Sequence, residues 1–218
     1  MLRVFQSKEE TRSFYDKIAR VYELMAEHSE QPMREAGLAL LEAASGETIL
    51  EVGCGTGHCL VELVRAVGPS GRVLGVDLSE NMLDESRKLL TREQLTEQVE
   101  LHRCDAAQLP VADESLDGIF TSFTLELFDT PELPQVLAEW RRALKPGGRL
   151  VVVAISKEGS PSLVLKAFEW THRHFPNLMD CRPIYVRHAL EAAGFSIKGN
   201  SIQSTWVPVE IVLGVKKQ

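Results

Sequence analysis

The chain has 218 residues, of which 44% are hydrophobic and 25% charged, a balance typical of one soluble globular domain. Its formal net charge of −7 disfavours nucleic acid as a partner, because proteins that bind nucleic acid neutralise phosphates with basic patches. No apolar run reaches the roughly 18 residues needed to span a bilayer, and the N-terminus has no apolar signal-peptide core. We therefore expect a cytoplasmic protein without a transmembrane segment.

The four cysteines, at positions 54, 59, 104 and 181, form no C-x-x-C pair. In a chain expected to be cytoplasmic, free thiols are expected rather than disulfides. Cys54, His58 and Cys59 lie close in sequence, but they fall on a glycine-rich loop and the start of a helix, which is a weak pattern for a metal site. We therefore expect no bound metal.

Two helices are expected at the N-terminus. Phe14, Ile18 and Met25 recur at helical spacing, which predicts one amphipathic helix around them. A second helix is expected to run from about Pro32, a residue suited to the first turn of a helix, to Ala44. Together, residues 1–45 would form a helical cap on the rest of the domain.

From residue 46 the pattern changes to alternating strands and helices. Strands are expected at residues 48–52, 72–77, 99–103, 116–123 and 150–155, and helices at 58–67, 79–90 and 132–144. Such alternation is typical of a parallel sheet with helices on both faces. We therefore predict an α/β, Rossmann-like, doubly wound core over residues 46–155, with a turn at Pro146-Gly147-Gly148 before its last strand.

The remaining residues, 156–218, indicate an acceptor-side insert followed by a hairpin. Helical patterns come first, at 161–175 and at 185–193, and the second ends at Gly194. Strands at 195–202 and 209–216 with a short connection then predict an antiparallel hairpin. The expectation is a single domain over residues 1–218 with a mostly parallel, seven-stranded sheet. The sequence does not distinguish a monomer from a homodimer.

A glycine-rich segment, Glu51-Val52-Gly53-Cys54-Gly55-Thr56-Gly57, follows the first expected strand. Ligands in doubly wound sheets bind outside the carboxyl ends of the strands, and glycines let the backbone turn sharply and approach a ligand closely. Dinucleotide sites favour G-x-G-x-x-G. The spacing here is G-x-G-x-G, and His58 stands where the third dinucleotide glycine would fall.

Two carboxylates accompany this loop. Asp77 ends the second expected strand, where its carboxylate can accept hydrogen bonds from ribose hydroxyls. Glu51 precedes the first glycine by two residues. A negative charge there is unfavourable beside a pyrophosphate but suits a ligand that carries an ammonium and a sulfonium. The combination favours S-adenosylmethionine (SAM) over a dinucleotide as the cofactor.

The same residues carry a resemblance to a known family. The loop, the segment Val76-Asp77-Leu78-Ser79 with Met82, and Cys104-Asp105-Ala106 are similar in order and spacing to motifs of the class I SAM-dependent methyltransferases. The resemblance is to the type 11 branch, with the ubiquinone and menaquinone C-methyltransferases, whose capping helix is similar to Tyr15-Asp16-Lys17-Ile18-Ala19. It implies a SAM-dependent methyltransferase with cofactor-binding residues Tyr15, Glu51, Gly53, Cys54, Gly55, Gly57, Asp77, Leu78, Met82, Asp105, Ala106 and Ser122.

Two residues are candidates for catalysis. By the resemblance, the segment after the fourth expected strand, residues 122–129, borders the transferable methyl group, and Glu126 lies in it. Glu126 is a candidate to orient the acceptor or accept its proton, and the alternative is an ion pair with a neighbouring basic residue. His172, in the insert expected to cover the acceptor, is a second candidate base, although His174 would face another side of the same helix.

The acceptor is indicated only by its expected surroundings. Aromatic residues such as Phe14, Phe123 and Phe128 suggest a small apolar or amphiphilic acceptor, quinol-like or lipid-like. The Arg-Asn pair that quinone-pathway relatives carry after the fourth strand is absent, so a small amine or thiol acceptor stays open. A non-catalytic SAM-binding regulator also stays open. An NAD(P)-dependent oxidoreductase is disfavoured, because the sequence has no Y-x-x-x-K motif.

Overall fold

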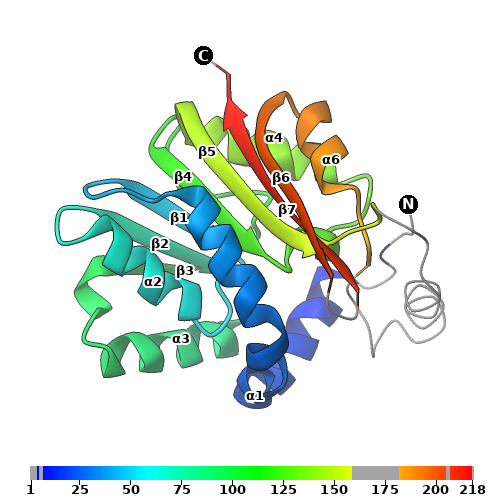
Figure 1. Ribbon diagram of the computed structural model, residues 1–218. Coiled ribbons are helices and arrows are strands. Elements are labelled where there is room, and N and C mark those ends of the chain that lie inside the picture. Colours follow the sequence, from blue (N-terminus) through cyan, green and yellow to red (C-terminus); the bar gives the residue numbers. More distant parts are fainter. Residues whose placement is uncertain (1–3, 5–6, 159–181, 205–206, 218) are drawn as a thin grey trace.

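The computed structural model describes residue 4 and residues 7–158, 182–204 and 207–217, and for residues 20–29 the backbone alone. Within these residues, strands form one sheet in the order β3-β2-β1-β4-β5-β7-β6 (Figure 1). They are β1 (Thr48–Val52), β2 (Arg72–Asp77), β3 (Val99–Arg103), β4 (Leu116–Ser122), β5 (Leu144–Ile155), β6 (Phe195–Ser204) and β7 (Pro208–Lys216). β1 to β5 are parallel, and β7 is antiparallel to both of its neighbours. The fold class predicted from the sequence is confirmed.

Helices cover both faces of this sheet. The described helices are α1 (Lys8–Leu41), α2 (His58–Val67), α3 (Glu80–Arg92), α4 (Leu133–Ala143) and α6 (Val186–Ala192), with 3-10 turns η1 (Thr96–Gln98) and η2 (Leu125–Leu127). α1, α2 and α3 pack on one face, and α4 and α6 on the other (Figure 1). The helix expected at 161–175 lies outside the described residues.

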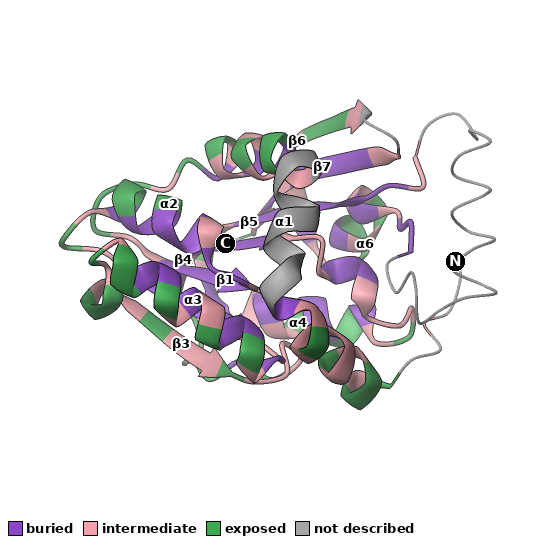
Figure 2. Cartoon of the chain, turned by 90° about the horizontal axis from the view of Figure 1, so that it is seen from below, coloured by how far each residue is buried: buried purple, intermediate pink, exposed green. Residues whose placement is uncertain are grey.

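Successive residues of the strands supply two separate cores. In β1, Ile49 packs with side chains of α1, α2 and α3, whereas its neighbour Leu50 packs with those of α4 and α6. Both residues are fully buried, because successive side chains of a strand point to opposite faces of the sheet. Figure 2 shows the consequence: buried strands lie between helices that are exposed only on their outer sides. This double burial explains the mostly apolar sequence of the central strands, such as residues 150–155 of β5.

The N-terminal cap is one helix and not the two that the sequence predicted. α1 runs without interruption from Lys8 to Leu41, with Pro32 inside it. A proline removes one backbone N–H and usually kinks or ends a helix. Beyond this proline, however, Met33 and Leu41 are buried in the same core as α2 and α3. The packing of the residues after Pro32 keeps α1 continuous, although the proline cannot donate a backbone hydrogen bond.

The last strands also differ in detail from the prediction. Pro146-Gly147-Gly148 lies within β5, which begins at Leu144 and not near Leu150. The pairing between β4 and β5 jumps from Leu116–Leu144 to Gly118–Arg149, so the expected turn is an irregularity within one strand. The predicted hairpin is present, and β7 inserts between β5 and β6, which leaves β6 at the edge of the sheet.

Candidate cofactor and acceptor site

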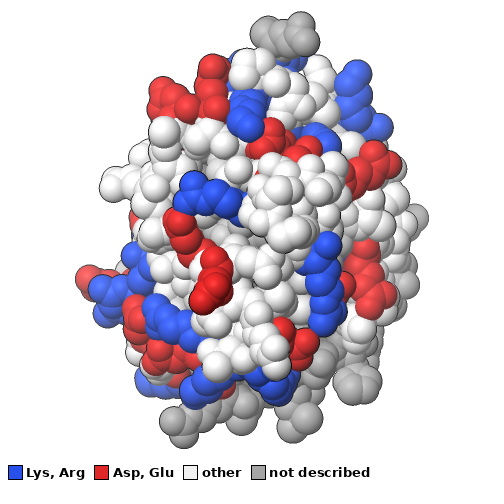
Figure 3. Space-filling view, turned by 90° about the vertical axis from the view of Figure 1, so that its left-hand side faces the viewer, with Lys and Arg blue, Asp and Glu red and all other residues white. Residues whose placement is uncertain are grey.

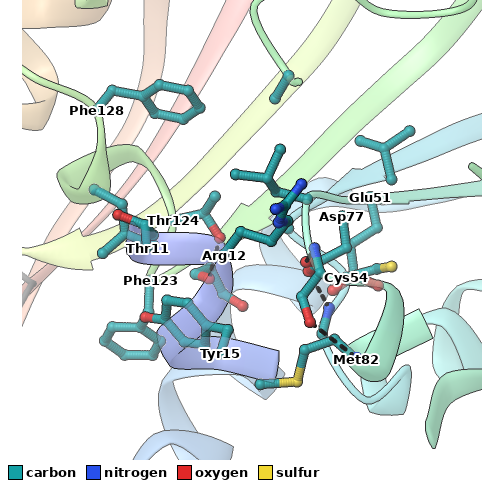
Figure 4. Close-up of a pocket in the computed structure, with 18 of the residues that line it drawn as sticks. Thr11, Arg12, Tyr15, Glu51, Cys54, Asp77, Met82, Phe123, Thr124 and Phe128 are labelled. Carbon is teal, nitrogen blue, oxygen red and sulfur yellow. Dashed lines mark hydrogen bonds between the residues drawn. The ribbon is translucent and has the colours of Figure 1, made fainter. Parts of the chain in front are cut away.

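A cavity lies at the carboxyl ends of the parallel strands, bordered by the first turns of α1 (Figure 4). One side, here called the loop wall, consists of residues at and after the carboxyl ends of β1, β2 and β3: Glu51, Gly53, Cys54, Gly55, Thr56, His58, Cys59, Val76, Asp77, Leu78, Ser79, Met82, Cys104, Asp105 and Ala106. The other side, here called the helix wall, comes from the N-terminal segment and the segment after β4: Val4, Lys8, Thr11, Arg12, Tyr15, Ser122, Phe123, Thr124, Leu127, Phe128, Asp129 and Glu132. Arg34, from the second half of α1, also lines the cavity.

The glycine-rich loop has a backbone that glycine adopts at least cost. Gly53, Gly55 and Gly57 have φ angles of 70°, 50° and 90°, in the left-handed region where a Cβ causes strain. A Cβ on Gly53 would lie 2.1 Å from Oγ1 of Thr124, whereas a Cβ on Gly55 would meet no atom within 4 Å. The loop therefore needs glycine at Gly53 for space and at Gly55 for backbone conformation.

Gly57 has a packing role that the sequence did not predict. It is absent from the cavity lining in the described part of the chain and stands as the N-cap of α2. A Cβ at this position would lie 2.4 Å from Oγ of Ser86 on α3. The lack of a side chain lets α2 and α3 approach each other, and the cofactor contact expected of Gly57 stays a prediction.

Asp77 ties the end of β2 to the glycine-rich loop. One carboxylate oxygen accepts a hydrogen bond from the N–H of Gly55 and the other from the N–H of Ser79, each at 2.9 Å. Burial raises the pKa of Asp77, although these hydrogen bonds act in the opposite direction. Each oxygen has a second lone pair, so the carboxylate can still accept a hydrogen bond from a ligand in the cavity.

Glu51 is a buried acid on the floor of the loop wall. Its side chain is 2% exposed, and burial raises its pKa to about 8, while the positive charge of Arg34 partly opposes the shift. Its Oε2 has no hydrogen-bond partner in the described part of the chain. Because an unpaired buried polar atom is costly, its presence beside a cavity points to a ligand group that pairs with it. A cationic group fits this requirement.

Two cysteines of the loop wall, Cys54 and Cys59, are structural thiols. Cys54 and Cys59 are buried and free, and burial raises the pKa of both well above the usual value. Neither is therefore a thiolate near neutral pH, which makes both poor nucleophiles. Among the described residues, no group of three or more His, Cys, Asp or Glu side chains is arranged to hold a metal.

The first turns of α1 are fastened over the loop wall. Lys8 Nζ lies 2.6 Å from Oδ2 of Asp105 and 3.2 Å from Oε1 of Glu132. On the next turns, the Asp16 carboxylate accepts a hydrogen bond from the Ser79 hydroxyl at 2.5 Å, and the Asp16 carbonyl accepts one from the Asn81 amide at 2.8 Å. These contacts join α1 to the segments that follow β2, β3 and β4, and so hold Tyr15 against the cavity.

Phe123 is held in an uncommon backbone conformation at the end of β4. Its φ angle is 52°, a left-handed value that costs a non-glycine residue about 1–3 kcal/mol. The N–H of Phe123 donates to the carbonyl of Val153 at 2.8 Å, which helps to maintain this conformation. The phenyl ring thereby lies in the helix wall together with Tyr15 (Figure 4).

Glu126 is not among the described residues that line the cavity, and its role toward the acceptor stays a prediction. Glu126 lies in η2 with a fully buried side chain, and its Oε1 accepts a hydrogen bond from the N–H of Ile155 at 3.2 Å. Its neighbours Leu127 and Phe128 face the cavity instead. His172, the other candidate, lies outside the described residues.

Replacing Glu126 with alanine is expected to lower the free energy of unfolding by about 1–3 kcal/mol, because it leaves a buried N–H without its acceptor. Glu126→Gln keeps an oxygen at that position and should lose less. Urea denaturation would measure the change, and calorimetry should find the affinity for S-adenosylhomocysteine (SAH) unchanged in both variants. A fully stable Glu126→Gln variant that binds SAH but has lost turnover would place Glu126 in the mechanism.

The cavity brings together all the cofactor-binding residues expected from the sequence except Gly57. What the sequence analysis missed is the rest of the α1 face: Lys8, Thr11 and Arg12 precede Tyr15 at positions that share one side of a helix. That spacing is visible in the sequence, but only the structure shows that this side faces a cavity. In the described part of the chain, no helix is both long and apolar enough to cross a membrane.

Known proteins with a similar sequence or fold agree with this geometry. Residues 49–148 match the family model described as a methyltransferase domain. The chain is 35% identical over 137 residues to a demethylmenaquinone methyltransferase of Lactobacillus johnsonii, an alignment that covers 63% of this chain and 55% of the relative. It is 34% identical over 161 residues to a demethylmenaquinone methyltransferase of Halalkalibacterium halodurans, covering 72% of this chain and 64% of that protein. The chain therefore spans between about half and two thirds of these relatives.

A crystal structure of a SAM-dependent methyltransferase from Aquifex aeolicus shares the fold. It superposes with a TM-score of 0.64 at 24% identity, over 84% of this chain and 89% of that chain. The relatives, the matched domain model and the glycine-rich loop with its carboxylates agree with one another. Residues 49–148 of this chain form a class I, SAM-dependent methyltransferase domain.

Proposed function

We propose that this chain transfers a methyl group from SAM to a small amphiphilic acceptor. The observation that carries the proposal is Glu51, a buried carboxyl group beside the glycine-rich loop whose Oε2 has no partner in the described part of the chain. The ammonium of SAM fits that oxygen, and the ribose hydroxyls fit the carboxylate of Asp77 at the end of β2. The family resemblance assigns Asp105 and Ala106 to the adenine. When bound, SAM supplies a methyl group that its sulfonium has already activated.

The helix wall supports an acceptor with an apolar body. Val4, Phe123, Leu127 and Phe128 contribute apolar side chains to it, and such side chains favour a ligand with apolar surface to bury. The demethylmenaquinone methyltransferases similar to this chain support a quinol-like acceptor within that class.

A nucleic-acid acceptor has no support on the surface that faces the viewer in Figure 3. Lys and Arg side chains are interspersed there with Asp and Glu and form no continuous basic patch. The net charge of −7 works in the same direction. A small-molecule acceptor is the better proposal on both grounds.

In this proposal the protein acts mainly by positioning. Holding the methyl group and the acceptor atom in line contributes at most about 7–11 kcal/mol to lowering the barrier. The carboxylates of the helix wall are already engaged, since Asp129 accepts a hydrogen bond from the N–H of Val4 at 3.1 Å and Glu132 pairs with Lys8. His172 remains the proposed base for an acceptor that must lose a proton.

The proposal is tested with methyl-labelled SAM and three acceptors: a short-chain demethylmenaquinol, a long-chain alkylamine and a small thiol. More label in the quinol product than in the amine or thiol product is the expected result. Transfer to the amine or thiol alone would show that the acceptor is an amine or a thiol and not a quinol. SAH binding without transfer to any acceptor would favour a non-catalytic SAM-binding regulator. Asp77→Asn should reduce transfer at least about tenfold through weaker SAM binding. Asp84→Asn, which changes an exposed aspartate on α3, should leave transfer unchanged.

A further inference from the structure

Among the described residues that line the cavity, one cationic side chain has no ion-pair partner. The lysine and arginine side chains in this described lining are Lys8, Arg12 and Arg34. Lys8 pairs with Asp105 and Glu132, and Arg34 pairs with Glu30. Arg12 makes no ion pair or hydrogen bond with any residue that the structure describes. A guanidinium stays charged at any physiological pH, so this positive charge is always available to a ligand.

The position of Arg12 on α1 directs it to the cavity. Lys8, Thr11, Arg12 and Tyr15 share one side of the helix and all line the cavity. Arg12 is also exposed, so it stands where the cavity opens to solvent. In Figure 4 its side chain extends between Thr11 and Phe128 on one side and Glu51 and Asp77 on the other. It is thus placed to reach a ligand that enters beside the cofactor.

Arg34 is the better partner for the carboxylate of SAM itself. The proposed function places the ammonium of SAM at Glu51, and the carboxylate is bonded to the same carbon atom as that ammonium. Arg34 lies close enough to Glu51 to lower its pKa, so it stands at this amino-acid end. Arg12 is left for the second ligand of the cavity.

We infer that Arg12 binds an anionic oxygen of the methyl acceptor, which is therefore an amphiphile with an apolar body and an acidic group. This inference rests on the proposed function and narrows its acceptor class. The apolar body packs against Phe123, Leu127 and Phe128, while the acidic group reaches Arg12 at the open end. Carboxylate and phosphate oxygens match the planar fork of a guanidinium, which binds them with two parallel hydrogen bonds.

The test uses two aromatic probes of nearly equal shape, 1-hydroxy-2-naphthoate and its uncharged amide, 1-hydroxy-2-naphthamide. Binding of each is measured by fluorescence titration to the full chain saturated with SAH. The unaltered protein is expected to bind the naphthoate at least about tenfold more tightly than the amide. Arg12→Met should abolish this preference, and Arg12→Lys should retain part of it, because lysine keeps the charge but loses the fork.

Lys17→Met is the matched control. Lys17 is an exposed cation on the same helix, and it is not among the residues that line this cavity in the described structure. This variant should keep the preference for the naphthoate and the affinity for SAH. If Lys17→Met removes the preference as fully as Arg12→Met does, the preference arises from long-range electrostatic attraction and not from contact with Arg12. That result overturns the inference.

The remaining outcomes separate this inference from the proposed function. Equal affinities of the unaltered protein for the two probes overturn the role of Arg12 and leave an apolar acceptor in place. A loss of SAH affinity in Arg12→Met, with the probe preference kept, overturns it by assigning Arg12 to the carboxylate of SAM. SAH binding with no affinity for either probe overturns both the inference and the amphiphilic acceptor. A failure of the unaltered protein to bind SAH would contradict the proposed function itself.

Discussion

Replacing Glu51 with glutamine is expected to weaken SAH binding by about ten- to a hundredfold and, at the same time, to stabilise the protein at alkaline pH. The first effect arises because glutamine offers no negative charge to the ligand's ammonium. The second arises because the buried carboxylate of Glu51 is unfavourable in the folded protein without a ligand. Opposite changes in binding and stability are typical of a residue kept for function.

The pH dependence follows from the direction of the pKa shift. Burial raises the pKa of Glu51 from 4.5 to about 8, so between these values the folded chain holds a proton that the unfolded chain has released. The free energy of unfolding therefore falls as the pH rises through this window, by at most about 5 kcal/mol. Glu51→Gln cannot ionise and should lack this loss. Urea denaturation at pH 6 and pH 9 would measure the difference.

Calorimetry gives an independent check on the same residue. At pH 7 the carboxyl group of free Glu51 is protonated, so binding a cationic ligand should release up to about one proton. Titrations with SAH in buffers of different ionisation enthalpy would detect that proton in the unaltered chain and none in Glu51→Gln. Glu62→Gln, an exposed position on α2, should behave like the unaltered chain. Unchanged SAH affinity in Glu51→Gln would contradict the role proposed for this carboxylate.

Gly53→Ala is expected to abolish measurable SAH binding, with a loss of at least about a hundredfold. The added Cβ would lie 2.1 Å from Oγ1 of Thr124, a distance that forces the glycine-rich loop and the segment after β4 apart. Because those two segments form facing walls of the cavity, the geometry of both is lost together. Calorimetry would measure the affinity, and circular dichroism would establish that the variant is folded.

Gly147→Ala separates this packing effect from backbone strain. Gly147 has a φ angle of 79°, similar to the 70° of Gly53, but a Cβ there would meet no atom within 4 Å. Alanine at Gly147 should therefore lower the free energy of unfolding by about 1 kcal/mol and leave SAH binding intact. If both variants lost binding equally, left-handed strain and not the contact with Thr124 would explain the result.

The parts of the site that consist of residues close together in the sequence could be predicted from the sequence. The strand, the glycine spacing and the carboxylates Glu51 and Asp77 are short-range features, and the doubly wound pattern fixes where the carboxyl ends of the strands meet. Local spacing specifies such elements because each depends on a few neighbouring residues. The confirmed fold class, a doubly wound and mostly parallel sheet, rests on the same alternation of strands and helices.

Residues far apart in the sequence decided the rest. Lys8 and Asp105 are 97 positions apart, and nothing in either segment alone indicates that the two side chains meet. The close packing of Gly57 against Ser86 on another helix is likewise not visible in the local sequence. The free energy of such contacts depends on how whole elements pack, which short-range patterns do not encode.

The same reason explains two features of the helices and turns. A proline predicts the start of a helix, yet α1 passes through Pro32 because the residues after it are buried against the sheet. The sequence shows that Glu126 lies next to residues that line the cavity, but it does not show the direction of the Glu126 side chain. The turn η2 points it into the protein, where the N–H of Ile155 donates to it. The sequence by itself determined the fold class and the cofactor loop, whereas tertiary packing decided which side chains line the cavity.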